Sequence, residues 1–252
     1  MNAHPARGRI AAFFDLDGTL LPLPSLERRF VAILRAQGAI AARNYFRWLA
    51  FAVRLAPLGI TALTHANKTY LRNVSAGATP NQLPAFFPAA LDRAARHAAQ
   101  GHSLILVTGT LEPLAKQAGL ALLLRLLVRG VTASVGVSAT RLEQVEGQWT
   151  GRILGDAMFG EAKASAMQRI AASCGFDLAR SYAYGDSTHD RWMLGAVGRP
   201  VAVNPSRELE RIARLRNWPV VRWTDERQHA SAVTDRKGSG GCTAILKSET
   251  LG

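Results

Sequence analysis

The stretch AAFFDLDGTLLP at residues 11–22 decides how the rest of the chain is interpreted. Four apolar residues run directly into two aspartates, Asp15 and Asp17, with Gly18 and Thr19 close behind. An apolar run this short, bounded by polar residues and a glycine, is typical of a buried strand. Two carboxylates so close to each other repel and resist burial. Their place directly after a buried strand therefore indicates a functional requirement.

Length and composition indicate an ordinary folded protein. The 252 residues suffice for one α/β domain with an insertion, or for two small domains. Only Cys174 and Cys242 are available as cysteines, which excludes a disulfide framework or a zinc ligand set and suits a reducing cytosol. No apolar run reaches the ~18 uncharged residues of a membrane-spanning helix, and the first run is too short for a signal peptide. We therefore predict a cytoplasmic location.

The net charge of +13 is concentrated in residues 22–96, which hold ten basic and two acidic residues. One interpretation is a solvated helical face, and another is a cap that attracts an anionic substrate. A third is contact with a membrane surface or a nucleic acid, because arginines alternate with Tyr45, Phe46, Trp48 and Phe51. We expect no nucleic-acid partner, because no recognised nucleic-acid module is present. Peripheral membrane contact ranks below the first two interpretations, and the oligomeric state stays open.

Strand-like and helix-like segments alternate along most of the chain. The patterns predict strands at 9–14, 102–109, 131–138, 181–186, 199–204 and 219–223, a hairpin at 141–153, and helices at 111–129, 161–173 and 205–217. This alternation predicts an α/β fold with a doubly wound, mostly parallel sheet.

A long helical segment separates the first two predicted strands. Helical spacing covers residues 25–56, and further helices are predicted at 60–73 and 81–99. A simple crossover between parallel strands needs far fewer residues. We therefore predict a core formed by residues 1–21 and 97–224 and an inserted helical cap at 22–96. A polar, glycine-containing tail at 225–252 is predicted to be disordered.

Polar side chains gather at the predicted strand ends, where open α/β sheets bind their ligands. The strand ends and the start of one helix carry carboxylates, one ammonium group, a hydroxyl group and a glycine: Asp15, Asp17, Thr108, Gly109, Lys163, Asp186 and Asp190. Carboxylates supply the oxygen ligands that Mg²⁺ prefers, and an ammonium group can neutralise phosphoryl oxygens. This combination suits metal-assisted phosphoryl transfer.

The two aspartates can divide the work of such a reaction. Asp15, Asp186 and the backbone carbonyl of Asp17 can supply the protein ligands of Mg²⁺. One aspartate can attack phosphorus and form an aspartyl phosphate, while its neighbour two positions on transfers protons. Lys163 and Thr108 would neutralise and orient the phosphoryl oxygens.

Four stretches of the sequence resemble, in order, the motifs of the haloacid dehalogenase (HAD) superfamily. They are FFDLDGTL, LILVTGT, the lysine of FGEAK, and YGDSTHD, and the resemblance extends over about residues 9–223. The helical insertion and the ending GRPVAVNPSRELERIARLRNWPVVRW look like the subfamily that contains phosphoserine phosphatases, subfamily IB. The resemblance implies a Rossmann-like core, a helical cap, Mg²⁺ and an aspartyl-phosphate intermediate.

The resemblance also implies a role for each matched residue. Asp15 matches the nucleophile and Asp17 the general acid/base that phosphatases carry. Thr108 and Lys163 match the phosphate-binding pair, with Gly109 beside them, and Asp186 matches the metal ligand. Asp190 matches a second acid that positions metal-bound water or the lysine, and Thr19 belongs to the supporting residues.

Two departures from the phosphoserine phosphatase pattern leave the substrate open. Gly18 stands where those enzymes typically have serine, and Pro24 stands where they carry the acidic residue that holds the substrate amine. His189 stands where many relatives have asparagine, and its role stays open. We predict a Mg²⁺-dependent hydrolase of a small phosphorylated metabolite. The alternatives are a phosphotransferase to an acceptor hydroxyl, and a basic lipid-surface or nucleic-acid-binding protein with a vestigial site.

Overall fold

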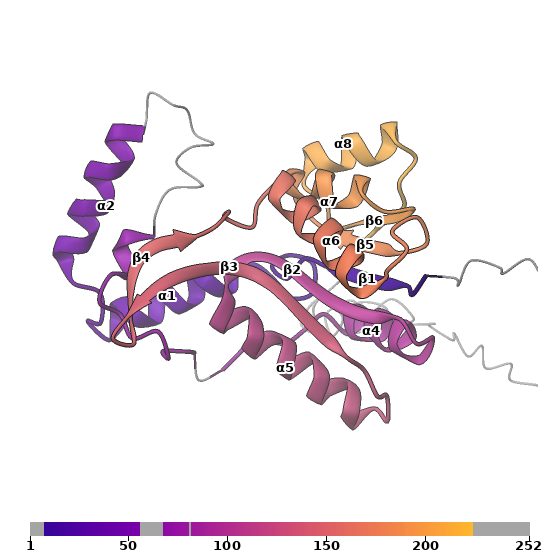
Figure 1. Ribbon diagram of the computed structural model, residues 1–252, viewed down its shortest axis with the longest axis horizontal. Coiled ribbons are helices and arrows are strands. Elements are labelled where there is room, and N and C mark those ends of the chain that lie inside the picture. Colours follow the sequence, from indigo (N-terminus) through magenta and orange to yellow (C-terminus); the bar gives the residue numbers. More distant parts are fainter. Residues whose placement is uncertain (1–7, 56–67, 81, 224–252) are drawn as a thin grey trace, which may run out of the picture.

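A seven-stranded sheet forms the centre of the protein, as seen in a computed structural model that describes residues 8–55, 68–80 and 82–223 (Figure 1). The spatial order is β4-β3-β2-β1-β5-β6-β7. The strands are β1 (Ala11–Phe14), β2 (Ser103–Leu111), β3 (Val135–Val145), β4 (Gln148–Leu154), β5 (Tyr182–Gly185), β6 (Arg199–Val203) and β7 (Val220–Val221). All neighbours pair in parallel except β3 and β4, which form an antiparallel hairpin.

Helices cover both faces of this sheet. The helices in the described part of the chain are α1 (Leu26–Ala36), α2 (Ala42–Leu55), α4 (Pro88–Ala99), α5 (Glu112–Val128), α6 (Glu161–Cys174), α7 (Arg191–Gly195) and α8 (Arg207–Leu215), with 3₁₀ turns η2 (Thr69–Leu71) and η3 (Thr188–Asp190). Along β1, Ala12 and Phe14 pack into one hydrophobic cluster with α4 and α5, whereas Ala11 and Phe13 pack into a second with α6, α7 and α8. Alternate residues of a strand face opposite sides. The predicted doubly wound α/β fold is therefore confirmed.

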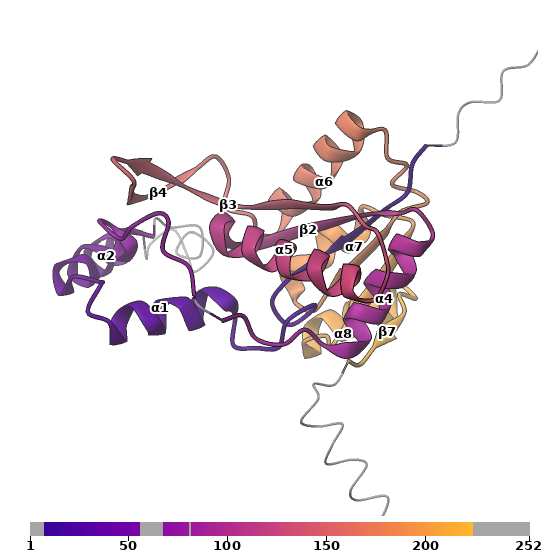
Figure 2. The same ribbon diagram turned by 90° about the horizontal axis from the view of Figure 1, so that it is seen from below.

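The helices α1 and α2 lie at the end of the molecule opposite α8 (Figure 2). The β3–β4 hairpin reaches into this region, where Trp149 is buried and its ring meets Phe30 of α1 edge-on, with centroids 6.2 Å apart. Backbone hydrogen bonds of 2.9 Å join the Trp149 N–H to the Val74 carbonyl and the Asn73 N–H to the Trp149 carbonyl. We call the region formed by α1, α2 and η2 the cap layer. It thus also includes the tip of the β3–β4 hairpin, which comes from outside residues 22–96.

Several elements differ from the sequence-based predictions. The helix predicted at 81–99 begins only at Pro88, because a residue that precedes proline is disfavoured in the helical conformation. Of the helix predicted at 60–73, the described part is the single turn η2. The predicted strand at 131–138 begins at Val135 and continues into the hairpin. The short helix α7 was not predicted, and the tail at 225–252 lies outside the described residues.

The domain boundaries remain predictions. Although most of α4 falls within the range predicted for the cap, the helix contacts β2 and α5. None of the helices in the described part of the chain has the length and apolar character needed to cross a membrane.

A buried histidine should make the stability of the fold depend on pH. His97 is 4% exposed, and its Nε2 lies 2.8 Å from the Tyr184 hydroxyl while its Nδ1 lies 2.9 Å from His102 Nδ1. Burial, helped by the charges of His102, Arg93 and Arg96, lowers the pKa of His97 from 6.5 to about 4. The unfolded chain therefore binds a proton at this residue before the folded chain does. Stability should fall as the pH drops through this interval.

We expect this one group to lower the free energy of unfolding by about 2 kcal/mol between pH 7 and pH 5. Urea unfolding of the wild type and of His97→Gln at both pH values measures the effect. The variant should lose correspondingly less stability on acidification. Equal losses in the two proteins would show that His97 does not titrate in this way.

Candidate active site

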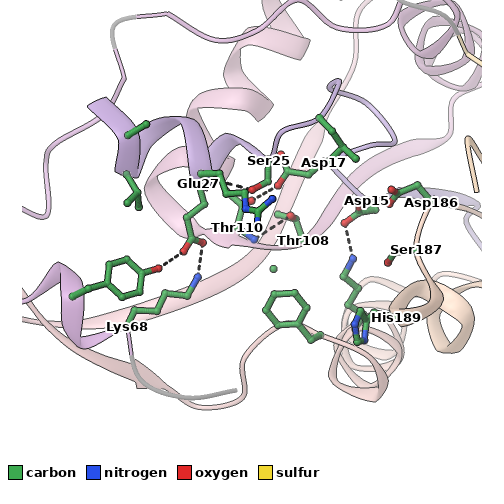
Figure 3. Close-up of a pocket in the computed structure, with 18 of the residues that line it drawn as sticks. Asp15, Asp17, Ser25, Glu27, Lys68, Thr108, Thr110, Asp186, Ser187 and His189 are labelled. Carbon is green, nitrogen blue, oxygen red and sulfur yellow. Dashed lines mark hydrogen bonds and ion pairs between the residues drawn. The ribbon is translucent and has the colours of Figure 1, made fainter. Parts of the chain in front are cut away.

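A cavity of about 970 Å³ opens at the carboxyl edge of the sheet. Because β1, β2 and β5 run in parallel, the residues at their carboxyl ends reach the same edge. Asp15 follows β1, Thr108 lies near the end of β2, and Asp186 follows β5. Figure 3 shows these three side chains facing the cavity, with residues from α1 on its other side.

A buried lysine joins two of the predicted acidic residues. The Lys163 ammonium lies 2.5 Å from Asp15 Oδ1 and 2.6 Å from Asp190 Oδ1, and all three side chains are at most 7% exposed. Lys163 is in the first turn of α6, which follows Gly160. The mutual attraction between these charges offsets part of what their burial costs. The pKa of Lys163 is raised, because its two carboxylate partners outweigh its own burial.

Asp190 holds the lysine and the loop after β5 together. Its Oδ2 accepts hydrogen bonds from the backbone N–H groups of Asp186 and Ser187, at 3.2 and 3.0 Å, and from the Ser187 hydroxyl at 2.8 Å. Burial raises the pKa of Asp190, but Lys163 and these hydrogen bonds outweigh it, so the pKa stays low. Asp190 therefore connects Lys163 to the loop after β5, and Ser187 forms a capping box with Asp190 at the start of the 3₁₀ turn η3.

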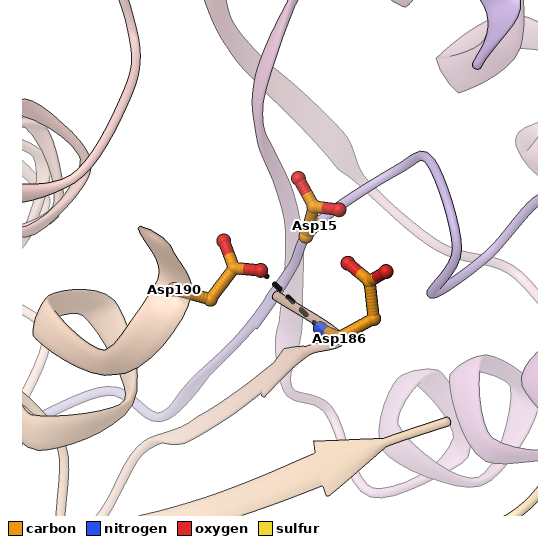
Figure 4. Close-up of side chains that lie close together, drawn as sticks. All are labelled: Asp15, Asp186 and Asp190. Atoms are coloured by element: carbon orange, nitrogen blue, oxygen red, sulfur yellow. Dashed lines mark hydrogen bonds between the residues drawn. The ribbon is translucent and has the colours of Figure 1, made fainter. Parts of the chain in front are cut away.

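Asp15 and Asp186 are suited to a bound cation. Burial raises the pKa of Asp15 to about 7, and burial with the charges of Asp15 and Asp190 raises that of Asp186 to about 8. Oxygen atoms of Asp15, Asp186 and Asp190 lie within 4.8 Å of one another (Figure 4). Both oxygens of Asp190 accept hydrogen bonds, whereas Lys163 contacts only Oδ1 of Asp15, so Asp15 and Asp186 are, of these three, the carboxylates better placed to bind a metal. Their hard oxygen donors fit a divalent cation.

The Asp17 carboxylate points toward the cap and not toward the cluster of Asp15, Asp186 and Asp190. Its Oδ1 accepts a hydrogen bond from the Leu26 N–H at the start of α1 (2.7 Å), and its Oδ2 accepts one from the Thr110 hydroxyl (2.5 Å). Burial raises the pKa of Asp17 despite both hydrogen bonds. Its predicted metal contact therefore depends on its backbone carbonyl.

Thr110 is the functional contact that the sequence did not reveal. A threonine directly after a glycine is typical of a turn, yet the Thr110 hydroxyl holds Asp17. The sequence did offer one indication. Thr110 lies two residues after Thr108, and residues two apart in a strand have their side chains on the same face. Thr108 lines the cavity and is 1% exposed, and its hydroxyl accepts the Thr110 N–H at 3.2 Å. Thr19 is buried away from the cavity, and its hydroxyl has no hydrogen-bond partner among the described residues.

Two glycines make room for the site. Gly18 has φ +86°, and a Cβ there would lie 2.2 Å from Asp186 Oδ2. A Cβ on Gly109 would lie 2.5 Å from the Phe159 ring. Both Gly109 and Phe159 line the cavity, as does His189, whose ring meets Phe159 edge-on at 6.2 Å. The absence of side chains at these glycines thus sets how closely the neighbouring groups approach.

Replacing Gly18 with alanine should displace the Asp186 carboxylate. Because a misplacement of about 1 Å can lower a rate about 100-fold, we expect at least that loss in kcat/KM for p-nitrophenyl phosphate. Gly147→Ala is the matched control, since Gly147 has φ +74° with no atom within 4 Å of an added Cβ. Steady-state kinetics with thermal melting should show backbone strain in both variants and lost activity only in Gly18→Ala. Similar activities would contradict the steric role.

The wall of the cavity on the cap side consists mainly of residues from α1, with Lys68 and Tyr70 beside them. Glu27 lies at the centre of a small cluster in which the Lys68 ammonium contacts Oε2 and the Tyr70 hydroxyl donates a 2.8 Å hydrogen bond to Oε1. The remaining cap residues on this wall are Leu23, Ser25, Arg28, Val31, Ala32, Arg35 and Trp48.

Known proteins resemble this chain along most of its length. The chain matches the family of haloacid dehalogenase-like hydrolases over residues 12–195. A protein of Mycobacterium tuberculosis strain H37Rv, named as a probable phosphatase, is 30% identical over 98% of this chain and 85% of its own length. A phosphoserine phosphatase of the same strain is 31% identical over 83% and 70%.

Solved structures share the same architecture. A protein of unknown function from Bordetella pertussis Tohama I is 29% identical, with a TM-score of 0.65 over 85% of this chain and 98% of its own. A probable phosphoserine phosphatase from Vibrio cholerae has a TM-score of 0.57 at 18% identity over 90% and 67%, which is a likeness of fold alone. Together with the cluster of Asp15, Lys163, Asp186 and Asp190 at the sheet edge, the sequence match establishes that the chain is a member of the haloacid dehalogenase-like hydrolases.

Proposed function

We propose that this enzyme is a Mg²⁺-dependent phosphomonoesterase that acts on a small phosphorylated metabolite through an aspartyl-phosphate intermediate. The observation that carries the proposal is the contact of 2.5 Å between Lys163 and Asp15 at the edge of the cavity. It places a carboxylate nucleophile beside a fixed positive charge. The names of the relatives support the reaction class, and a cytoplasmic location remains part of the proposal.

The reaction begins at Asp15. One carboxylate oxygen attacks phosphorus, an acyl phosphate forms, and the bond from phosphorus to the ester oxygen breaks. Lys163, Thr108 and Gly109 line the cavity, where the ammonium, the hydroxyl and the backbone N–H would hold the phosphoryl oxygens. Asp190 keeps Lys163 in place through its contact of 2.6 Å.

Asp17 would transfer the protons of both steps. In its neutral form it donates a proton to the leaving ester oxygen, and in its charged form it removes a proton from the water that hydrolyses the acyl phosphate. The raised pKa of Asp17 favours the neutral form needed for the first step. The hydrogen bonds from Leu26 and Thr110 hold both oxygens of the carboxylate in fixed positions.

Asp15, Asp186 and the backbone carbonyl of Asp17 would hold Mg²⁺. When bound, the cation would neutralise the crowded carboxylates and the negative charge of the phosphoryl group. Buried oxygen donors whose own charges repel one another support this assignment.

The function is tested with purified protein and p-nitrophenyl phosphate. Hydrolysis should require Mg²⁺ and stop when excess EDTA is added. Equal release of phosphate and nitrophenol in the presence of added alcohols supports a hydrolase, whereas a deficit of free phosphate identifies a phosphotransferase. If neither this ester nor any member of a broad panel of phosphate monoesters is hydrolysed, the vestigial-site alternative holds and the proposal is wrong.

Replacing Asp17 with asparagine should lower kcat by about 10²–10⁴-fold, the usual contribution of a general acid–base residue. The loss should be larger for glycerol 2-phosphate than for p-nitrophenyl phosphate, because an alkoxide needs protonation more than nitrophenolate does. Parallel kinetics with the two esters measure this difference. An equal loss for both would contradict the assignment of proton transfer to the leaving group.

A further inference from the structure

The helix α1 presents two different faces. Leu26, Phe30 and Leu34 are buried in the hydrophobic core, whereas the opposite face lines the cavity with Arg28, Val31, Ala32 and Arg35. The spacing of these four residues, i, i+3, i+4 and i+7, places them in one row. At 1.5 Å per residue, the row spans about 10 Å, with an arginine at each end and apolar side chains between them.

The one carboxylate that the described cap residues contribute to the cavity is already occupied. Both Glu27 oxygens are engaged, one by the Lys68 ammonium and the other by the Tyr70 hydroxyl at 2.8 Å (Figure 3). The Glu27 and Lys68 side chains are 15% and 11% exposed, so the pair is largely shielded from water. A substrate ammonium would have to displace Lys68 to reach this carboxylate. The pair therefore holds no free charge for a cationic substrate.

The arginines of the same row retain their charge. Neither Arg28 nor Arg35 forms an ion pair with another described residue, although Arg35 lies over the Tyr45 ring at 5.3 Å. Because Glu27 and Lys68 cancel, the described cap residues give this wall a net positive charge. Unpaired guanidinium groups at the edge of a cavity are good ligands for carboxylates and phosphates, since they offer two parallel donors.

We infer that this enzyme selects phosphate monoesters whose leaving group carries a second anionic group, which the Arg28–Arg35 row binds, and discriminates against leaving groups with a free ammonium. This inference depends on the proposed function. The apolar part of the leaving group would lie along Val31, Ala32 and Trp48. The cavity volume of about 970 Å³ leaves room for a leaving group much larger than a single hydroxymethyl unit.

Three esters of similar size but different charge provide the test. Phosphoglycolate carries a carboxylate, phosphoethanolamine an ammonium group and 2-hydroxyethyl phosphate no charge on the leaving group. We expect kcat/KM to be at least about tenfold higher for phosphoglycolate than for phosphoethanolamine, the usual size of one charge-assisted contact. Longer phosphooxyalkanoates and alkanediol bisphosphates then determine whether a carboxylate or a second phosphate is preferred. Either preference supports the inference.

Substitutions in α1 test whether its two arginines cause the preference for an anionic leaving group. Arg28→Gln and Arg35→Gln should each lower the ratio of kcat/KM for the anionic ester to that for the neutral ester by about tenfold or more. Arg47→Gln removes the same charge from an exposed position of α2 that does not line the cavity, so its ratio should equal that of the wild type. If the α1 variants change the ratio no more than Arg47→Gln does, the row does not bind the second anion.

A third variant tests the occupied carboxylate. Lys68→Met removes the cation that pairs with Glu27 and leaves its Oε2 free, which should raise kcat/KM for phosphoethanolamine relative to the neutral ester by about tenfold. Thermal melting shows whether this variant folds, and the two arginine variants test the inference independently if it does not. A wild-type enzyme that hydrolyses p-nitrophenyl phosphate without preferring the anionic esters overturns the inference alone. An enzyme inactive on every ester overturns the proposed function.

Discussion

Replacing Asp15 with asparagine is expected to lower kcat for p-nitrophenyl phosphate by on the order of 10⁴-fold or more, as the loss of a catalytic nucleophile does elsewhere. Asparagine has the same shape, but its amide is not a nucleophile and cannot form an acyl phosphate. Lys163 keeps its second partner, since Asp190 Oδ1 lies 2.6 Å from the ammonium. The site should therefore keep its arrangement while losing its chemistry.

Steady-state assays and thermal melting together test this expectation. Asp92→Asn is a suitable control, because Asp92 is 62% exposed and pairs with Arg129 outside the cavity. Its activity should match that of the wild type. The Asp15→Asn protein should melt within a few degrees of the wild type, because the substitution also removes one of several crowded carboxylates. Turnover above about one per cent would show that Asp15 is not the nucleophile.

Replacing Lys163 with methionine is expected to have the largest effect on stability. Asp15 and Asp190 would be left buried without their cation, and breaking a buried ion pair on one side costs about 3–5 kcal/mol. A loss of that size lowers Tm by about 10 °C in a chain of this length. Activity should be lost as well, because the phosphoryl oxygens lose their positive partner.

Urea unfolding gives the size of the effect, and Lys116→Met provides the comparison. Lys116 pairs with Glu112 one helical turn away and is 64% exposed, so its replacement should cost less than about 1 kcal/mol. The double variant Lys163→Met/Asp190→Asn should recover part of the stability, since one unpaired charge is removed. If Lys163→Met and Lys116→Met lose the same stability, the buried lysine does not hold the site together.

The sheet and the gathering of the acidic residues could be predicted because the signals are local. Each parallel strand is a short apolar run, and the residues after it must lie at one edge of the sheet. The run before Asp15 and the one before Asp186 follow this rule, and the structure brings both aspartates together with Lys163. The catalytic roles of these residues remain predictions.

The cap could not be predicted in the same way. Helical periodicity indicates an apolar face but not which surface that face contacts. The pairing of Glu27 with Lys68 joins residues 41 positions apart, and nothing local in the sequence indicates it. The same holds for Trp149, which packs on α1 from a hairpin far along the chain. Thr110 was missed because a threonine near a glycine is an ordinary turn residue.

The hairpin in the cap layer restricts how the enzyme can open. The segment that holds α1, α2 and η2 is covalently joined to the core before α1 and again before α4, and the Trp149 backbone bonds to Asn73 and Val74 join it a third time through β3 and β4. Any rotation of α1 away from the sheet must either break these hydrogen bonds or bend the hairpin with it. We expect substrate admission and product release by such a rotation to involve one of these two changes. Hydrogen exchange at the Trp149 amide should report which of the two occurs.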